Sequence, residues 1–305
     1  MRHALLIAGL IAVTTSIAGA ETFEAGGVKR NYTAIVPAAT PAPLVLVLHG
    51  NTQQGQDMRT RTSWPEVARR EGFAAVFPDR LNRAWADLRG DTGRAGRSPP
   101  AGTDDAAFLT ALIAKYVHDG VADPKRVYVT GVSNGGYMTL TLACTHAELF
   151  AAAASVIASF TETMMASCAP SRPLPILIMN GTADPLIAYD GGRGTSRYAV
   201  PNVVSTAATV AFWRKTNGCA AADARSTKLP DKDKDDASTV TRVDSDCPGG
   251  RDVVLYRVDG GGHRMPGSFP DARFVRVIDL LLGPQNHDID GAETIWAFFR
   301  NHTLP

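Results

Sequence analysis

A serine between glycines is the first residue in this sequence whose surroundings suggest chemistry. Ser133 lies within GVSNGG, at residues 131–136, directly after the apolar run 126–130. An apolar run followed by small residues predicts a strand, a sharp turn and a helix, a geometry that exposes a serine hydroxyl as a nucleophile. Because the pattern G-x-S-x-G also occurs in ordinary loops, the interpretation depends on whether the chain supplies a base, an acid and oxyanion donors.

Two further polar side chains follow apolar runs, in the order that a serine triad needs. Asp184 comes soon after the run 174–179, and His263 follows the run 252–258 and three consecutive glycines. The carboxyl ends of strands in an open α/β sheet meet at one edge, which would bring both side chains near Ser133. We expect His263 to be the base, and Asp184 to orient its imidazole and stabilise the cation. Taken by itself, an aspartate before proline would indicate only a turn.

Backbone N–H groups at two strand ends are the expected oxyanion donors. The run 44–48 leads through His49 to Asn51 and Thr52, and one of the last two should donate together with Asn134, the residue after the serine. A histidine that closes a buried strand beside glycine more often holds the loop by hydrogen bonds. His49 is therefore expected to be structural.

The elements that must position these residues are readable from apolar patterns. Continuous apolar runs, typical of buried parallel strands, occur at 44–48, 73–77, 127–130, 152–157 and 174–179, and residues 252–258 are expected to form another strand. Helices are expected from Ser63 to near Gly72 and from residues 103–105 to His118, and a hairpin at 23–36 should form an edge. The alternation predicts one α/β-hydrolase domain over residues 21–305, with a mainly parallel doubly wound sheet, helices on both faces and no large lid domain.

Composition argues against several classes of partner. The chain has 305 residues, of which 45% are hydrophobic and 20% charged, and its formal net charge is +1. This balance gives no reason to expect a nucleic acid or an anionic membrane as partner. Neither a C-x-x-C pair nor a histidine cluster at zinc spacing occurs, so we expect no metal. We also expect no cofactor, and the sequence shows no feature of an obligate protein partner.

The N-terminus has the composition of a secretory signal peptide. Met1-Arg2-His3 is basic, residues 4–13 are nearly all apolar, and Ala18-Gly19-Ala20 provides small residues before Glu21. We therefore expect residues 1–20 to be removed and the protein to be secreted, into the periplasm or the extracellular medium.

If the chain is exported, its cysteines are expected to form disulfides. Cys144, Cys168, Cys219 and Cys247 are an even number, and an oxidising compartment favours their pairing. Three pairings are possible. We favour the sequence neighbours, Cys144 with Cys168 and Cys219 with Cys247, since each pair would close a local excursion from the sheet.

Four runs of sequence carry a family resemblance: LVLHG at 46–50, TGVSNGGYM at 130–138, NGTADP at 180–185 and GGGHRMPG at 260–267. Together they resemble the secreted polyhydroxybutyrate depolymerase and feruloyl esterase group. The resemblance covers nearly all of the chain after the leader. It implies Ser133, Asp184 and His263 as the catalytic triad of a serine esterase, and it supports both neighbouring disulfides.

The substrate is less well indicated than the chemistry. Relatives in this group tend to carry tryptophan where this chain has Met265, and depolymerases of crystalline polymer often carry an extra binding domain. We expect a small or oligomeric ester, such as a hydroxyalkanoate oligomer or a feruloyl or acetyl ester. Trp85, Met265 and Tyr189 are the candidates for the acyl pocket.

Two other functions share these sequence features. A serine peptidase of the prolyl oligopeptidase type has a similar aspartate motif, although this chain lacks room for the propeller domain that gates peptides. A catalytically silent α/β-hydrolase scaffold used for binding is the other alternative. Against it, all three triad positions are present, with glycines around two of them.

Overall fold

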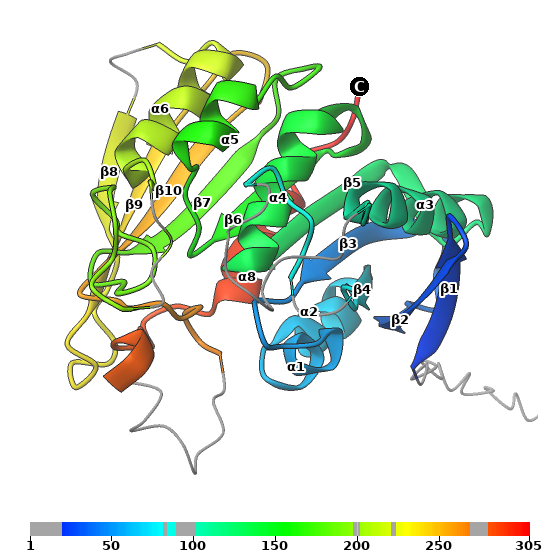
Figure 1. The fold of residues 1–305 in the computed structure, drawn as a ribbon, viewed down its shortest axis with the longest axis horizontal. Helices are drawn as coiled ribbons and strands as arrows, with labels where there is room; N and C mark the ends of the chain where they lie inside the picture. Colours follow the sequence, from blue (N-terminus) through cyan, green and yellow to red (C-terminus); the bar gives the residue numbers. More distant parts are fainter. Residues whose placement is uncertain are drawn as a thin grey trace, which may run out of the picture.

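A ten-stranded sheet forms the centre of the computed structural model (Figure 1). The structure describes residues 20–81, 84–89, 102–197, 200, 202–220, 224–268 and 280–305. The segment expected to be a signal peptide lies outside these residues, apart from residue 20. The strands are β1 (Glu21–Ala25), β2 (Val28–Ile35), β3 (Ala42–Leu48), β4 (Ala74–Pro78), β5 (Ala122–Val132), β6 (Ala152–Val156), β7 (Ile176–Gly181), β8 (Ala224–Lys228), β9 (Thr239–Ser245) and β10 (Val253–Asp259).

The middle of the sheet is parallel and both of its edges are antiparallel. The strand order is β1-β2-β4-β3-β5-β6-β7-β10-β9-β8. From β4 to β10 in this order the neighbours pair in parallel, whereas β1, β2, β8 and β9 pair antiparallel. The hairpin expected at residues 23–36 is the β1–β2 edge, and the predicted mainly parallel sheet is confirmed.

Side chains of the parallel strands alternate between two hydrophobic cores, one on each face of the sheet. In β3, Leu44, Leu46 and Leu48 belong to one core, and Val45 and Val47 belong to the other. Because both faces are covered, the strands read as continuous apolar runs in the sequence.

Helices cover both faces of this sheet. They are α1 (Gly55–Thr60), α2 (Trp64–Glu71), α3 (Asp105–His118), α4 (Asn134–Thr145), α5 (Glu162–Ser167), α6 (Thr206–Asn217) and α8 (Gly291–Phe299), with a short 3-10 turn at Ala147–Leu149. Side chains of α3, α4, α5 and α6 belong to one core, and those of α1, α2 and α8 belong to the other, which Figure 1 shows as two layers. The expected doubly wound α/β architecture is thus confirmed.

Local signals set the ends of the two helices that the sequence predicted. The α2 helix has Pro65 in its first turn and ends at Gly72, whose φ of 73° is in the left-handed region. The α3 helix begins after Asp104, whose side chain accepts a hydrogen bond of 2.8 Å from the backbone N–H of Ala107. Such a cap satisfies a backbone donor that the helix itself leaves unpaired.

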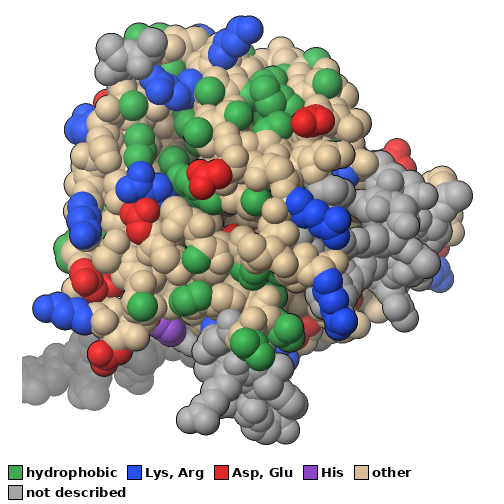
Figure 2. Space-filling model, turned by 60° about the vertical axis from the view of Figure 1, so that its left-hand side comes forward, with side chains coloured by type: hydrophobic (Ala, Val, Ile, Leu, Met, Phe, Trp, Pro, Cys, Tyr) green, Lys and Arg blue, Asp and Glu red, His purple; other side chains and the backbone are tan. Residues whose placement is uncertain are grey.

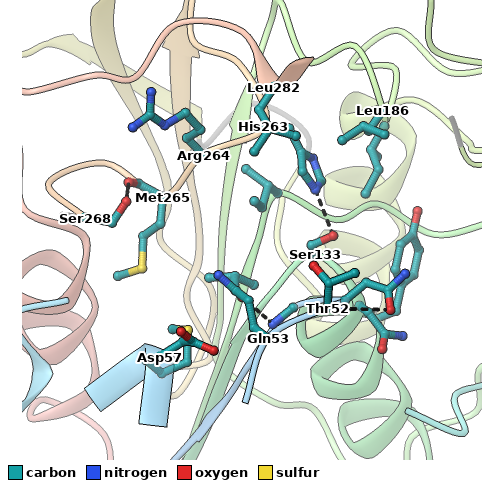
Figure 3. Close-up of a pocket in the computed structure, with 18 of the residues that line it drawn as sticks. Thr52, Gln53, Asp57, Ser133, Leu186, His263, Arg264, Met265, Ser268 and Leu282 are labelled. Carbon is teal, nitrogen blue, oxygen red and sulfur yellow. Dashed lines mark hydrogen bonds between the residues drawn. The ribbon is translucent and has the colours of Figure 1, made fainter. Parts of the chain in front are cut away.

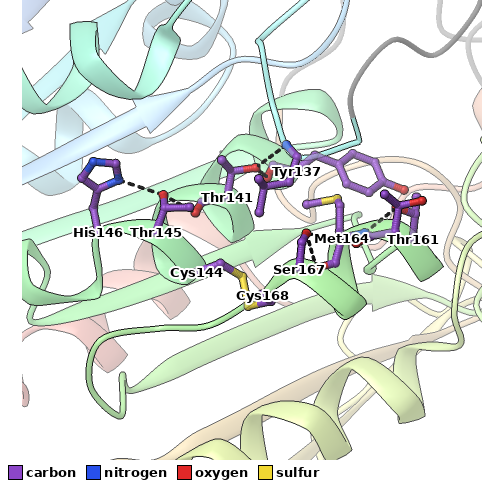
Figure 4. The surroundings of a disulfide bond; sticks show 11 residues. Tyr137, Thr141, Cys144, Thr145, His146, Thr161, Met164, Ser167 and Cys168 are labelled. Carbon is purple, nitrogen blue, oxygen red and sulfur yellow. Dashed lines mark hydrogen bonds between the residues drawn. A yellow bond between two sulfur atoms is a disulfide. The ribbon is translucent and has the colours of Figure 1, made fainter.

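Both disulfides join sequence neighbours, as expected. Cys144 at the end of α4 is bonded to Cys168 just after α5 (Figure 4), and Cys219 after α6 is bonded to Cys247 after β9. The first bond ties α5 to the C-terminal end of the helix that begins beside Ser133. The second ties the α6 helix to the antiparallel edge of the sheet.

The polar tract at 230–236 is the connection of the β8–β9 hairpin, and it is mostly exposed. Its backbone also has partners elsewhere in the chain. Asp288 accepts hydrogen bonds from the backbone N–H groups of Lys232 and Asp233, and Asp236 accepts one from His287. The hairpin tip is therefore anchored to the segment before α8.

Charges of both signs are interspersed on the face that Figure 2 shows. Among the described residues, no helix has both the length and the apolar character needed to cross a bilayer.

The Cys219–Cys247 bond closes a loop with a sequence separation of 28 residues. Replacing both cysteines together, Cys219→Ser with Cys247→Ser, should lower the free energy of unfolding by roughly 3 to 4 kcal/mol, because the unfolded chain regains the entropy of that loop. Urea denaturation followed by fluorescence measures the change. A loss below about 1 kcal/mol would contradict the expectation.

Candidate active site

The residues expected to do chemistry follow four parallel strands whose C-terminal ends lie at the same end of the sheet. Leu48 of β3 pairs with Gly131 of β5, and Gly181 of β7 pairs with Val258 of β10. Each of these strands continues into a loop or helix that carries a candidate residue. Parallel pairing in register therefore brings together positions that are far apart in sequence.

The structure brings Ser133, His263 and Asp184 into one hydrogen-bonded row (Figure 3 shows the first two). The Nε2 atom of His263 lies 2.8 Å from Oγ of Ser133, and its Nδ1 atom lies 2.7 Å from Oδ2 of Asp184. The histidine and the aspartate are both 8% exposed. A base in contact with a hydroxyl and oriented by a buried carboxylate is the geometry that activates a serine nucleophile.

The turn that carries Ser133 is strained, and the glycines beside it make it possible. Ser133 has φ of 54° and ψ of −116°, which is unusual for a residue with a side chain. A Cβ on Gly131 would lie under 3.0 Å from the Gly135 carbonyl, and one on Gly135 would lie under 3.0 Å from the Leu48 carbonyl. The backbone of α4 thus contacts the end of β3 directly.

Backbone contacts also fix the positions of the other two residues. The N–H groups of Gly262 and His263 donate to the carbonyls of Pro284 and Leu282. The second carboxylate oxygen of Asp184 accepts from the N–H groups of Leu186 and Ile187, at 2.7 and 2.9 Å. The imidazole and the carboxylate are therefore held in place before a substrate arrives.

The expected oxyanion donors lie beside the serine hydroxyl. Asn134 is the first residue of α4, so its N–H has no partner within the helix, and Asn51 and Thr52 line the same cavity as Ser133. Thr52 has a positive φ of 64°, and its N–H lies 3.2 Å from Oδ1 of Asn51. A hydrogen bond of 2.9 Å from the Gly50 N–H to the Gln53 side chain also holds this loop.

His49 lies beneath this loop and is fully buried. A guanidinium N–H of Arg80 donates to the carbonyls of Gly50 and Gln53, at 2.9 and 3.0 Å, and also contacts the imidazole. Burial lowers the pKa of His49 to about 3, and the nearby Arg80 charge acts in the same direction. The residue is a neutral brace for the loop, in agreement with the structural role expected from the sequence.

A cavity of about 720 Å³ opens at Ser133 (Figure 3). Besides Ser133, His263 and the three oxyanion candidates, it is lined by residues that include Gln53, Asp57, Met58, Arg61, Arg89, Tyr137, Ile157, Leu186, Ile187, Val200, Arg264, Met265 and Ser268. Met265, one of the candidates for the acyl pocket, is among these lining residues. A concave site with apolar walls and a few polar groups is typical of a small-molecule site.

Trp85 does not line this cavity, which corrects the expectation from sequence. It is 1% exposed; its indole N–H donates to the His49 carbonyl at 2.9 Å, and its backbone N–H donates to the Asn134 side chain at 2.8 Å. The tryptophan packs behind the oxyanion loop and supports it, since its polar atom is already paired inside the protein.

Tyr189 also lies elsewhere. Burial raises its pKa, and the charges of Arg257 and Asp259, on the far side of β7 from Ser133, act on its hydroxyl. The chain turns sharply after Asp184, because that carboxylate binds the next two backbone N–H groups. Leu186 and Ile187 therefore face the cavity where Tyr189 was expected.

A buried polar cluster beside the nucleophile has no clear pattern in the sequence. The Arg89 guanidinium forms two hydrogen bonds with the Asp87 carboxylate, and the Asn134 side chain donates to the same carboxylate at 3.0 Å. Asp105 at the start of α3 accepts from the Ala86 N–H and from Arg30. The acidic pair at 104–105 predicts a helix start, and α3 does begin there. Its buried member, Asp105, also anchors the loop that carries Asp87 and Arg89.

The buried His49 should make folding sensitive to acid. Its pKa is about 3 in the folded protein against an ordinary 6.5, so between these pH values the unfolded chain binds a proton that the folded chain excludes. Stability should therefore fall as the pH falls through this window, by up to about 1.4 kcal/mol per pH unit.

We expect His49→Gln to flatten this part of the stability profile, measured by urea denaturation at several pH values. His118→Gln is the matched control, because the His118 side chain is 89% exposed and should leave the slope unchanged. An unaltered slope in His49→Gln would show that another group causes the acid sensitivity.

Comparisons with known proteins agree with this geometry. A family model described as "Esterase PHB depolymerase" matches residues 31–204, a range that contains Ser133 and Asp184 but not His263. The NocK protein of Nocardia uniformis subsp. tsuyamanensis, which is named as an esterase, is 32% identical over 246 residues, or 75% of this chain and 67% of that protein. Feruloyl esterase B of Piromyces equi is 28% identical over 227 residues, or 73% of this chain and 39% of that protein.

Among solved structures, the acetyl xylan esterase from Aspergillus awamori aligns with a TM-score of 0.55 at 15% identity, over 87% of this chain and 99% of that chain. This likeness shows the fold. Together with the match of the family model over more than half of the sequence, it leads to one conclusion: the chain belongs to the Esterase PHB depolymerase family and has the α/β-hydrolase fold.

Proposed function

We propose that this protein is a serine esterase, which hydrolyses carboxylic esters through an acyl-enzyme formed on Ser133. The observation that carries the proposal is the hydrogen-bonded row of Ser133, His263 and Asp184 at the wall of a 720 Å³ cavity. Family membership supports the same reaction class, and the residue roles rest on the geometry.

In the first half of the reaction, His263 Nε2 takes the proton of Ser133 as Oγ attacks the ester carbonyl. The carbonyl oxygen becomes an oxyanion, which accepts hydrogen bonds from the N–H of Asn134 and from that of Asn51 or Thr52. Asp184 stabilises the imidazolium. When the tetrahedral intermediate collapses, the imidazolium gives its proton to the leaving alcohol.

In the second half, the same groups act on water. His263 removes a proton from a water molecule, whose oxygen attacks the acyl-serine carbonyl. The second tetrahedral intermediate collapses, the proton returns to Ser133 Oγ, and the carboxylic acid leaves. No group other than the chain's own residues and water is needed to balance either half.

The names of the relatives and the size of the cavity support a proposed substrate class. The relatives' names include feruloyl esterase, acetylxylan esterase and poly(3-hydroxyalkanoate) depolymerase, and this chain spans only 23% to 39% of the length of three proteins so named. A cavity of 720 Å³ has room for a small ester or a short oligomer. We propose hydroxyalkanoate oligomers or feruloyl or acetyl esters as substrates.

Secretion is part of the proposal. Both cysteine pairs of the described chain are disulfide-bonded, which suits an oxidising compartment. The composition of residues 1–20 supports export, and detection of mature protein beginning at Glu21 in a periplasmic or culture fraction would test it.

Replacing the nucleophile tests the proposed chemistry. Ser133→Ala should lower the hydrolysis of p-nitrophenyl butyrate by on the order of 10⁶-fold, to the background rate, while the thermal unfolding transition stays nearly unchanged. Ser167→Ala on α5 is the matched control and should hydrolyse the ester at the wild-type rate. Retained activity in Ser133→Ala would end the proposal. Labelling of wild type by a fluorophosphonate, lost in the variant, separates an active esterase from a silent scaffold.

Removing the acidic member tests the division of roles. Asp184→Asn should lower kcat by on the order of 10⁴-fold with a small change in KM, because the amide favours the wrong tautomer of His263. Steady-state kinetics on the same ester measures both constants.

A comparison of substrates separates an esterase from a peptidase. If the wild type hydrolysed peptide amides faster than esters, a peptidase would replace the esterase as the better description.

A further inference from the structure

One wall of the cavity includes a tyrosine whose buried hydroxyl has no hydrogen-bond partner in the described part of the chain. Tyr137 lies on α4, one helical turn after Ser133, and it lines the cavity although its side chain is 0% exposed. Its Oη atom has no partner among the described residues. Burial of an unpaired hydroxyl is costly, so such groups are rare in folded proteins unless a ligand completes them.

A second donor on the same wall is held in a fixed orientation. Nε and Nη2 of Arg89 donate to the two carboxylate oxygens of Asp87, at 2.8 and 2.6 Å, so this pair does not use the N–H groups of Nη1. The guanidinium lies 3.8 Å from the centre of the Tyr137 ring. Arg89 and Tyr137 are thus stacked on one another, and both line the cavity.

The cluster is joined directly to the nucleophile turn. The Asn134 side chain donates to the Asp87 carboxylate at 3.0 Å, while its side-chain oxygen accepts from the Trp85 backbone. Asn134 follows Ser133 in the chain, so the two donors have a defined position relative to the reacting hydroxyl. A substrate atom bound by them lies at a fixed distance from the scissile carbonyl.

The chemistry of the wall selects the kind of group that fits it. The hydroxyl and the guanidinium N–H groups that Asp87 does not bind are donors, whereas the cavity's aliphatic residues Ile157, Ile187 and Val200 offer no side-chain hydrogen bonds. Asp87 already neutralises the charge of Arg89. A neutral acceptor oxygen, as in a hydroxyl or a second ester carbonyl, therefore suits this wall better than a carboxylate does.

We propose that Tyr137 and Arg89 form a subsite that binds an oxygen atom of the substrate next to the scissile ester. This inference rests on the proposed function and narrows it: esters that carry a hydroxyl or carbonyl beside the reacting group are preferred over plain alkyl esters of the same size. Apolar surroundings strengthen hydrogen bonds of this kind and make a missing partner costly.

Isosteric ester pairs test the subsite on each side of the reacting bond. Ethyl 3-hydroxybutyrate and ethyl 3-methylbutyrate differ by hydroxyl against methyl on the acyl side, and 2-hydroxyethyl butyrate and propyl butyrate differ in the same way on the alcohol side. For each pair, the ratio of the two kcat/KM values is measured in the wild type, in Tyr137→Phe and in Arg89→Met.

In the wild type, the oxygenated ester of one pair should be preferred by about tenfold, and Tyr137→Phe should lower that ratio by about fivefold, as expected for loss of one hydrogen bond. Arg89→Met should lower it at least as much. Tyr128→Phe is the matched control: it also removes the hydroxyl of a buried tyrosine, one that donates to the His302 carbonyl away from the cavity, and its ratios should equal those of the wild type.

The pair whose ratio changes identifies the acyl or the alcohol side as the one that the subsite serves. Ratios that stay unchanged in Tyr137→Phe for both pairs, while the variant folds and all four esters are hydrolysed, would overturn the subsite and leave the esterase proposal intact. Hydrolysis of none of the four esters by the wild type would overturn both.

Discussion

Direct backbone contact between the start of α4 and the end of β3 is the constraint on which the rest of the site depends. Gly135 approaches the Leu48 and His49 carbonyls so closely that a Cβ would not fit. This contact places the Ser133 turn beside the loop that follows β3. Because two parallel neighbours end side by side, the nucleophile and the oxyanion donors come from adjacent strands, although residues 49–121 separate these strands in the sequence.

The contact also explains why buried polar side chains lie behind the loop that follows β3. The loop after β3 must hold donors in a strained arrangement, with Thr52 at a positive φ, and it needs support from below. His49, Arg80 and the Trp85 indole supply that support through carbonyl oxygens of the loop. These donors pair carbonyl oxygens of the loop inside the protein and so hold the loop in place.

The fold and most of the site could be predicted from local patterns, since those patterns have local physical causes. Continuous apolar runs indicated strands covered on both faces, and the structure places their residues alternately in two cores. Ser133, Asp184 and His263 each follow such a strand, and parallel pairing brings them together. Signals of this kind survive in sequence because a strand, a glycine turn and a helix cap each depend on a few consecutive residues.

Contacts between distant segments were harder to foresee. Trp85 is a pocket candidate from the sequence, yet its indole N–H donates to the His49 carbonyl inside the protein. Tyr189 does not line the cavity, because Asp184 accepts hydrogen bonds from the next two backbone N–H groups and the chain turns there. Arg89 and Asp87 were missed altogether. Nothing in their own neighbourhood shows that Asn134 and Tyr137, some fifty residues later, pack against them.

The amino-acid sequence by itself therefore determined the order of strands and helices, the family, and the three residues at the strand ends, because each is encoded by neighbours in the chain. Tertiary structure alone decided which side chains face the cavity. That choice depends on where a buried polar atom finds its partner: Trp85 finds one within the protein, whereas among the described residues the Tyr137 hydroxyl has none. Which polar atoms remain for a substrate therefore depends on the hydrogen bonds that the rest of the folded chain makes.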